Sequence, residues 1–213
     1  MEIGKAVRDL RWDVRGIIHT DDRISRLPAE SRVVTEILQS MTIPRIKKIA
    51  DQHRWDFRDN ERYGRSYPDM TVITDSERIA IDVKSARKEK GDAISRMTLG
   101  TYNGYFLHPK NKILHNKTLC YDDYAKHLII SIVYEWYPDE STTEMVKINT
   151  VQVGEKWQFA SKTSGSGNTA NIGGVDSLQK LKERNGDFKT NNEFEAYWRK
   201  YSREHPRRGM QRK

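Results

Sequence analysis

The sequence predicts an α+β (α/β) protein in which a mixed β-sheet core is flanked by helices. Residues 27–41 and 45–53 carry apolar side chains at helical spacing. Two short apolar runs at 70–74 and 78–83 are separated by three polar residues, and residues 127–137 are rich in β-branched and aromatic types. Strands that are mixed with helices of this length are typical of a sheet covered by helices.

The length and charge of the chain narrow the class of protein. The 213 residues suit one domain, and the single cysteine, Cys120, excludes a disulfide scaffold. The formal net charge is +8, and the last eight residues carry four positive charges and no acid. Such a tail suits phosphates, but charge alone leaves nucleic-acid binding and a merely solvated basic surface equally open.

Nothing in the sequence resembles a membrane or secretion signal. The amino terminus mixes charges throughout, and the longest apolar stretch is interrupted by Ser131 and Glu135 and is too short to span a bilayer. We therefore expect a cytoplasmic, soluble protein with no membrane partner.

Three helices are predicted in order along the chain. The first, 27–41, is opened by Pro28, and Pro44 is expected to separate it from the second, 45–53. A closing helix spans residues 191–205 and is expected to have Asn191 or Asn192 as its N-cap.

The strands follow from alternation and from β-forming residues. The runs at 70–74 and 78–83 predict a β-hairpin, and 127–137 predicts a central strand. A further short strand is expected at 156–161, followed by a glycine-rich loop at 162–174.

The hairpin gathers charged residues at its open end. Alternation places Asp82 and Lys84 side by side on one face of the second strand, opposite the apolar face. Asp69 lies at the start of the first strand, so the two aspartates can converge. Two carboxylates repel each other unless a cation lies between them, and a hard divalent ion with oxygen ligands fits there.

The triplet Asp82-Val83-Lys84 is weak evidence when taken alone. A chain of this composition contains about two or three such triplets by chance, and Asp187-Phe188-Lys189 is another. The strand context and the second carboxylate favour the first triplet, and an ion pair on a solvated face remains the alternative reading.

The segment "YPDMTV…IAIDVK" resembles the PD-(D/E)xK nucleases. Further segments resemble the EcoRV-like type II restriction endonucleases in the same order along the chain: "WDVRGII", "KIADQH", "YPDMT", "IAIDVK", "TLGTY", "GSGNTANIG" and "EFEAYWRKY". This resemblance implies one restriction-endonuclease-like domain over 1–213, whose C-terminal part, about 140–213, forms a DNA-recognition subdomain.

The resemblance also implies an activity. It is the Mg²⁺-dependent cleavage of both strands of a palindromic, GATATC-like site at its centre, which leaves blunt ends with 5′-phosphates. Asp69 and Asp82 are then the metal ligands, the backbone carbonyl of Val83 is a further ligand, and Lys84 orients or activates the attacking water.

A glutamate of the family has no direct counterpart here. Its aligned position falls at Gln39, and a neutral amide is a weaker Mg²⁺ ligand than a carboxylate. Glu36, one helical turn earlier, is the candidate replacement as a catalytic residue; an exposed helix acid is the alternative reading.

The same resemblance assigns the DNA contacts. The glycine-rich loop enters the major groove, where asparagine can pair with adenine and a threonine methyl can meet thymine. The candidate residues in it are Gly165, Ser166, Gly167, Asn168, Thr169 and Asn171. Before the Tyr-Pro-Asp motif, Gly64 and Arg65 stand where the family has a minor-groove Gln-Asn pair, and an arginine there reads groove shape.

The implied partners are double-stranded DNA, a second copy of the chain in a homodimer, and a cognate DNA methyltransferase. Two other functions stay open. A repair or junction-resolving nuclease would share the metal site without the major-groove loop. A non-catalytic DNA-binding protein would account for the charge but not for Asp69, Asp82 and Lys84.

Overall fold

The computed structural model describes residues 2–60, 67–107, 120–165 and 170–206. The helices are α1 (Glu2–Val7), α2 (Ser31–His53), the π-helix η2 (Asn103–Leu107), the 3-10 helix η4 (Tyr121–Asp123), α3 (Lys156–Phe159), α4 (Leu178–Glu183) and α5 (Asn191–Glu204). The strands are β1 (Ile17–Ile18), β2 (Ile24–Ser25), β3 (Asp56–Asp59), β4 (Met70–Ile73), β5 (Arg78–Arg87), β6 (Thr98–Thr101), β7 (Lys126–Trp136), β8 (Val146–Glu155), β9 (Ala160–Ser164) and β10 (Asn171–Gly174).

The main sheet is mixed, as predicted, and has the strand order β3-β4-β5-β7-β8. Strands β5 and β7 run parallel, and the other neighbours run antiparallel. The expected hairpin is β4–β5, and the expected central strand is β7, which has neighbours on both sides. A second sheet has the order β6-β10-β9, and β1 pairs with β2 in a separate hairpin.

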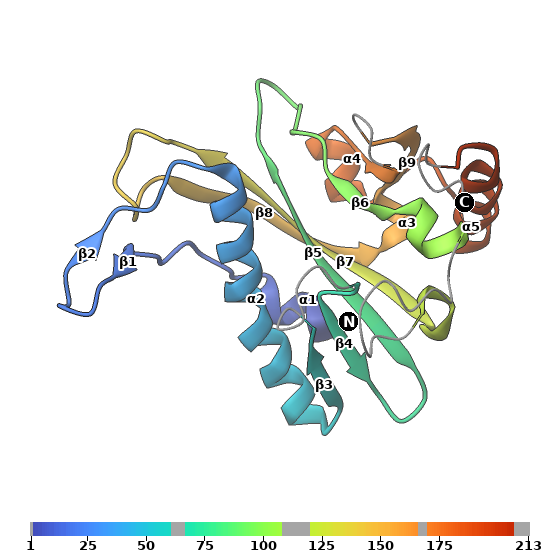
Figure 1. The fold of residues 1–213 in the computed structure, drawn as a ribbon, viewed down its shortest axis with the longest axis horizontal. Coiled ribbons are helices and arrows are strands. Elements are labelled where there is room, and N and C mark those ends of the chain that lie inside the picture. The colour runs from blue at the N-terminus through green and yellow to red at the C-terminus, as the bar shows by residue number, and fades with distance from the viewer. Residues whose placement is uncertain (1, 61–66, 108–119, 166–169, 207–213) are drawn as a thin grey trace, which may run out of the picture.

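Strand β7 is buried on both faces because each face of the main sheet is covered. Leu128, Ile130 and Ile132 pack into the core that α1 and α2 form on one face. Ile129 and Val133 pack into the second core, which includes residues of the small sheet and of α5 (Figure 1). A polar residue on the second face therefore points toward the small sheet and not toward the long helix.

The predicted break at Pro44 is wrong, because α2 continues through the proline to His53. Proline removes one backbone donor and crowds the preceding turn. A single buried stripe nevertheless crosses that point at a spacing of four residues: Val34, Leu38, Thr42, Ile46 and Ala50. The burial of this stripe against the sheet outweighs the lost hydrogen bond, so the two predicted helices form one.

The expectations for 156–174 also need correction. Residues Lys156–Phe159 form a helical turn in place of the predicted strand, and the strand begins only at Ala160. The backbone N–H of Glu155 donates to Gln158 Oε1 over 2.8 Å, which closes this turn. The turn carries the chain from the main sheet into the small one. The predicted loop is also shorter, since its ends belong to β9 and β10.

Helix α5 is confirmed, but its N-cap is Thr190 and not one of the two asparagines. The Thr190 hydroxyl accepts a hydrogen bond from the backbone N–H of Glu193 over 3.1 Å. The helix is anchored by Phe194 and Trp198, which are fully buried in the second core. In the part of the chain that the structure describes, no helix is both long and apolar enough to cross a bilayer.

The segment expected to form a recognition subdomain, about 140–213, is divided between the two sheets. Strand β8 belongs to the main sheet, whereas β9 and β10 form the small sheet together with β6. Figure 1 places this small sheet with α4 and α5 at one end of the molecule. The basic carboxyl-terminal residues 207–213 lie outside the described residues.

Candidate active site

Asp69 and Asp82 meet at the open end of the β4–β5 hairpin. The last pair of this ladder is Met70 with Ile81, so the next residue on each strand faces the other. The Asp69 backbone N–H donates to Asp82 Oδ1 over 3.3 Å, and the Val83 N–H donates to Asp69 Oδ2 over 2.8 Å. Each carboxylate is therefore held by the backbone of the opposite strand.

The ammonium group of Lys84 lies beside both carboxylates. Its Nζ is 3.8 Å from Asp69 Oδ2 and 3.6 Å from Asp82 Oδ2. Burial alone would lower the pKa of Lys84, but the two carboxylates outweigh it and raise that pKa. Lys84 consequently keeps its charge in the neutral pH range. The structure thus brings three predicted site residues together.

A second lysine, Lys156, lies beside the carboxylate of Asp82. It projects from α3, its Nζ lies 3.6 Å from Asp82 Oδ2, and its side chain is only 1% exposed. Burial, with a smaller contribution from the Lys84 charge, lowers the pKa of Lys156 to about 8, although Asp82 opposes the shift. A buried ammonium group next to a candidate metal ligand is absent from the sequence-based prediction.

Three tyrosine rings enclose this second ammonium group. The Lys156 Nζ lies 4.2, 4.3 and 5.4 Å from the ring centroids of Tyr67, Tyr105 and Tyr121. It also donates to the Tyr67 hydroxyl over 3.1 Å. That hydroxyl is also hydrogen-bonded to Nδ1 of His127. Burial, with a contribution from the Lys156 charge, lowers the pKa of His127 to about 2, so the ring is neutral.

The carboxylate pair has the chemistry of a small divalent-cation site. Asp82 Oδ2 is buried and has no hydrogen-bond partner among the described residues, which is unusual for a native structure. Within those residues there is no group of three or more His, Cys, Asp or Glu side chains that would hold a metal ion. Mg²⁺ keeps several water ligands and binds through one or two carboxylates, so Asp69 and Asp82 fit it.

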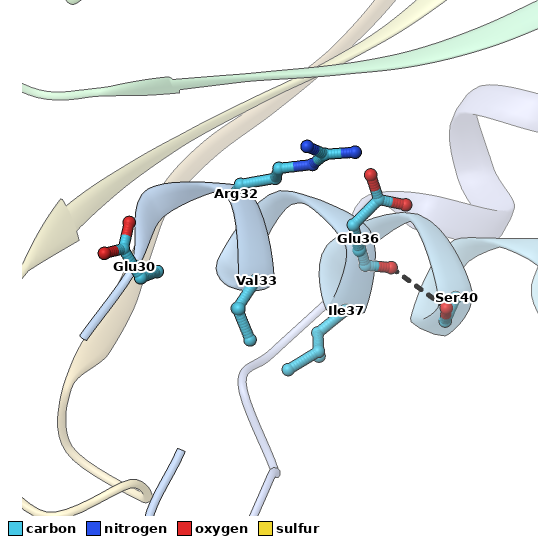
Figure 2. A pocket seen from close by; sticks show the side chains of 6 residues that line it. All are labelled: Glu30, Arg32, Val33, Glu36, Ile37 and Ser40. Carbon is cyan, nitrogen blue, oxygen red and sulfur yellow. Dashed lines mark hydrogen bonds between the residues drawn. The ribbon is translucent and has the colours of Figure 1, made fainter. Parts of the chain in front are cut away.

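Glu36 is not brought to the two aspartates. It lies on an exposed part of α2, in a groove lined by Glu30, Arg32, Val33, Glu36, Ile37 and Ser40 (Figure 2). Thr35, on the same helix, is hydrogen-bonded to Ser85 of β5 over 2.8 Å. Because residues four apart share a helix face, half-buried Gln39 lies on the face of α2 that meets β5, and Glu36 does not.

The candidate major-groove loop lies between β9 and β10 in the chain, and the structure describes only its two ends. Gly165 and Asn171 close its base, where the Gly165 N–H donates to the Asn171 carbonyl over 2.7 Å. The remaining DNA-contact candidates lie outside the described residues: Gly64, Arg65, Ser166, Gly167, Asn168 and Thr169.

The competing triplet Asp187-Phe188-Lys189 has a structural role. Asp187 Oδ2 accepts a hydrogen bond from the Lys162 backbone N–H over 2.8 Å, and Phe188 is buried in the second core. These contacts tie the segment before α5 to β9.

Lys156, Tyr67 and His127 carry no sequence signal for the roles they have here. Lys156 precedes an aromatic residue in a segment that reads as an ordinary strand, and His127 begins an apolar run. These residues lie near Asp82 because α3 and β7 pack against the hairpin, and no local sequence pattern predicts that packing.

Two comparisons with known proteins identify related sequences. The sequence profile of the family described as "Restriction endonuclease EcoRV" matches residues 8–213. The chain is also 30% identical over 210 residues to the type II restriction enzyme EcoRV of Escherichia coli, covering 91% of this chain and 84% of that enzyme.

Proposed function

Because the chain belongs to the EcoRV family of type II restriction endonucleases, we propose that it cuts both strands of a palindromic, GATATC-like site in a Mg²⁺-dependent reaction. The products are blunt ends with 5′-phosphates. The observation that carries this proposal is the cluster of Asp69, Asp82 and Lys84 at the open end of the hairpin. A metal-dependent nuclease can use such a cluster for phosphodiester hydrolysis, whereas a purely DNA-binding protein has no need of it.

Asp69 and Asp82 are the proposed Mg²⁺ ligands, and the carbonyl of Val83 is the third. The ladder with β4 ends at Ile81, and the Val83 N–H points toward Asp69. The N–H and C=O groups of one strand residue point to the same side, which supports this carbonyl as a ligand. When bound, the ion supplies an activated water and charge stabilisation at the phosphate and at the leaving oxygen.

Lys84 is the proposed partner of the attacking water. Its side chain is 23% exposed, so its ammonium group can reach a phosphate that arrives from solvent. The positive charge orients the water and offsets the negative charge that develops on the phosphate.

The small sheet is the proposed DNA-recognition unit. The segment between β9 and β10 contains asparagine and threonine, whose side chains suit the edges of adenine and thymine in the major groove. Gly64 and Arg65 are proposed to read the minor groove by its shape and potential. The recognition unit is thus composed of β6, β9, β10 and their helices, and β8 belongs to the catalytic sheet.

A palindromic site cut on both strands requires two active sites related by a twofold axis, so we propose a homodimer. Two apolar surfaces support it. The β1–β2 hairpin projects from the body of the molecule in Figure 1 and exposes Ile17, Ile18 and Ile24. The α2 groove adds Val33 and Ile37 (Figure 2). A methyltransferase that protects the same site completes the proposed system.

Digestion of a sequenced plasmid tests these proposals together. Purified protein should give discrete fragments with Mg²⁺ and none with EDTA, and sequencing of the ends should give one palindrome cut at its centre. Random fragments or staggered ends would contradict the proposed specificity or cleavage position. Sedimentation of the DNA-free protein should give twice the monomer mass.

A further inference from the structure

Among the described residues, two lysine ammonium groups lie beside the two carboxylates of the candidate metal site. Asp69 and Asp82 contribute two negative charges, and Lys84 and Lys156 contribute two positive charges within 4 Å of them. A pair of carboxylates by itself attracts a divalent cation strongly. Each of the two ammonium groups reduces that attraction before any DNA arrives.

The two lysines differ in their freedom to move. Lys84 is partly exposed and can turn toward a phosphate, whereas Lys156 is sealed from solvent. The tyrosine cage and the hydrogen bond to Tyr67 keep the Lys156 ammonium group beside Asp82 Oδ2. Its charge therefore stays in the site during every stage of binding.

We propose that Lys156 is a positioning residue that fixes the Asp82 carboxylate from its buried side and lowers the affinity of the DNA-free protein for divalent cations. The inference rests on the proposed metal site. A scissile phosphate adds negative charge beside the two ammonium groups. The cation and the DNA accordingly strengthen each other's binding.

The size of the effect follows from electrostatics. A unit charge acting on a divalent ion a few ångströms away, in a partly desolvated site, changes the binding free energy by more than the amount that corresponds to a tenfold change in affinity. Removal of Lys156 also loosens the Asp82 side chain, which weakens cation binding. This opposing effect is smaller, because the Asp69 N–H still holds Oδ1 of Asp82.

Binding of Mn²⁺ to DNA-free protein at pH 7, followed by electron paramagnetic resonance, tests the proposal. Lys156→Met keeps the length of the side chain without its charge, and Lys156→Gln also keeps a donor for Tyr67. Both variants should bind Mn²⁺ about tenfold more tightly or better than the wild type. The matched control is Lys126→Met, which removes the charge of a lysine paired with Glu77 at 2.7 Å, away from the two aspartates. It should bind Mn²⁺ as the wild type does.

Circular dichroism confirms that each variant is folded before the titration. Unchanged or weaker Mn²⁺ binding in the folded Lys156 variants would overturn the proposal, because a purely structural lysine leaves metal affinity unaltered. Asp82→Asn distinguishes a failure of the proposed metal site from a failure of the proposed role of Lys156. If it binds Mn²⁺ as the wild type does, the proposed metal site itself is wrong; if it loses Mn²⁺ while the Lys156 variants match the wild type, only the role of Lys156 fails.

Discussion

The Asp69 backbone N–H donates to Oδ1 of Asp82 over 3.3 Å, so the residue just before β4 fixes a carboxylate in the interior of β5. The reverse bond, from the Val83 N–H to Asp69 Oδ2 over 2.8 Å, fixes the first carboxylate in turn. Backbone groups of the hairpin itself therefore hold one oxygen of each carboxylate. The orientation and the charge of each aspartate can be tested separately.

Asp82→Asn retains the size of the side chain and the acceptor for the Asp69 N–H, but it removes the charge. Cleavage with Mg²⁺ should fall by about a thousandfold or more, equivalent to roughly 4 kcal/mol of transition-state stabilisation. Single-turnover digestion measures this loss, and Asp69→Asn should behave alike. Circular dichroism should match the wild type. Cutting of DNA by Asp82→Asn at the wild-type rate would refute the site assignment.

Lys84→Met should separate the proposed water-orienting role from metal binding. We expect cleavage to fall by about a hundredfold or more, since a positioned positive charge is lost from the transition state. The same variant should bind Mn²⁺ at least as tightly as the wild type, because a repelling charge has gone. Lys47→Met, which removes an exposed lysine paired with Asp51 on α2, is the control and should cut normally. Parallel loss of cleavage and Mn²⁺ binding would show that Lys84 supports the ligands instead.

Asn168→Ala should lower specific cutting before it affects salt-sensitive, non-specific DNA binding. The loss of one bidentate contact to adenine costs roughly 1–3 kcal/mol of discrimination. Cleavage of a cognate duplex is compared with that of single-base variants, and filter binding to random DNA is measured over a range of salt. Asn149→Ala on β8 removes an amide bonded to Glu135 and should leave both unchanged. An equal loss on all duplexes would rule out base reading by Asn168.

His127 should make the protein sensitive to acid. Its pKa is about 2 when folded and 6.5 in the reference state, so the unfolded chain binds the proton first. The stability that the neutral ring confers is complete above pH 6.5 and is lost as the pH falls below it. Between pH 7 and pH 5 the free energy of unfolding should fall by about 2 kcal/mol through this group.

The comparison for this pH effect is His127→Gln, whose amide can still form a hydrogen bond with the Tyr67 hydroxyl. Urea unfolding at both pH values, at one protein concentration, should show a smaller acid loss in the variant than in the wild type. Equal losses in the two proteins would show that other groups control the acid response.

Gly173 is required for the close approach of β9 and β10. A Cβ atom there would lie 2.5 Å from the backbone carbonyl oxygen of Thr163, which cannot move without disturbing the small sheet. Gly173→Ala should lower the free energy of unfolding by about 1–3 kcal/mol. Gly4→Ala is the control, since its nearest neighbour would be the Val153 Cβ at 3.9 Å and alanine favours the helix. Thermal unfolding measures both, and similar midpoints would contradict the packing argument.

Local patterns in the sequence were sufficient for the hairpin and its charged end. Alternation along 78–83 placed Asp82 and Lys84 on one face, and a short turn aligned Asp69 with Asp82. The alternation and the alignment both involve residues that are close in the chain, so strand geometry alone fixes the positions of these three side chains. The β-branched run at 127–137 likewise indicated a central strand, because only a strand covered on both faces buries such a sequence.

Only the tertiary structure decided which side chains surround the aspartates. Pro44 favours a helix end locally, yet the stripe that packs on the sheet continues α2 through it. The segment 156–159 has the composition of a strand, yet the passage between two sheets requires a turn there. That turn brings Lys156 to Asp82 and into the tyrosine cage. Contacts between residues so far apart in sequence arise from the packing of whole elements. The periodicity of the sequence predicts the elements but not these contacts.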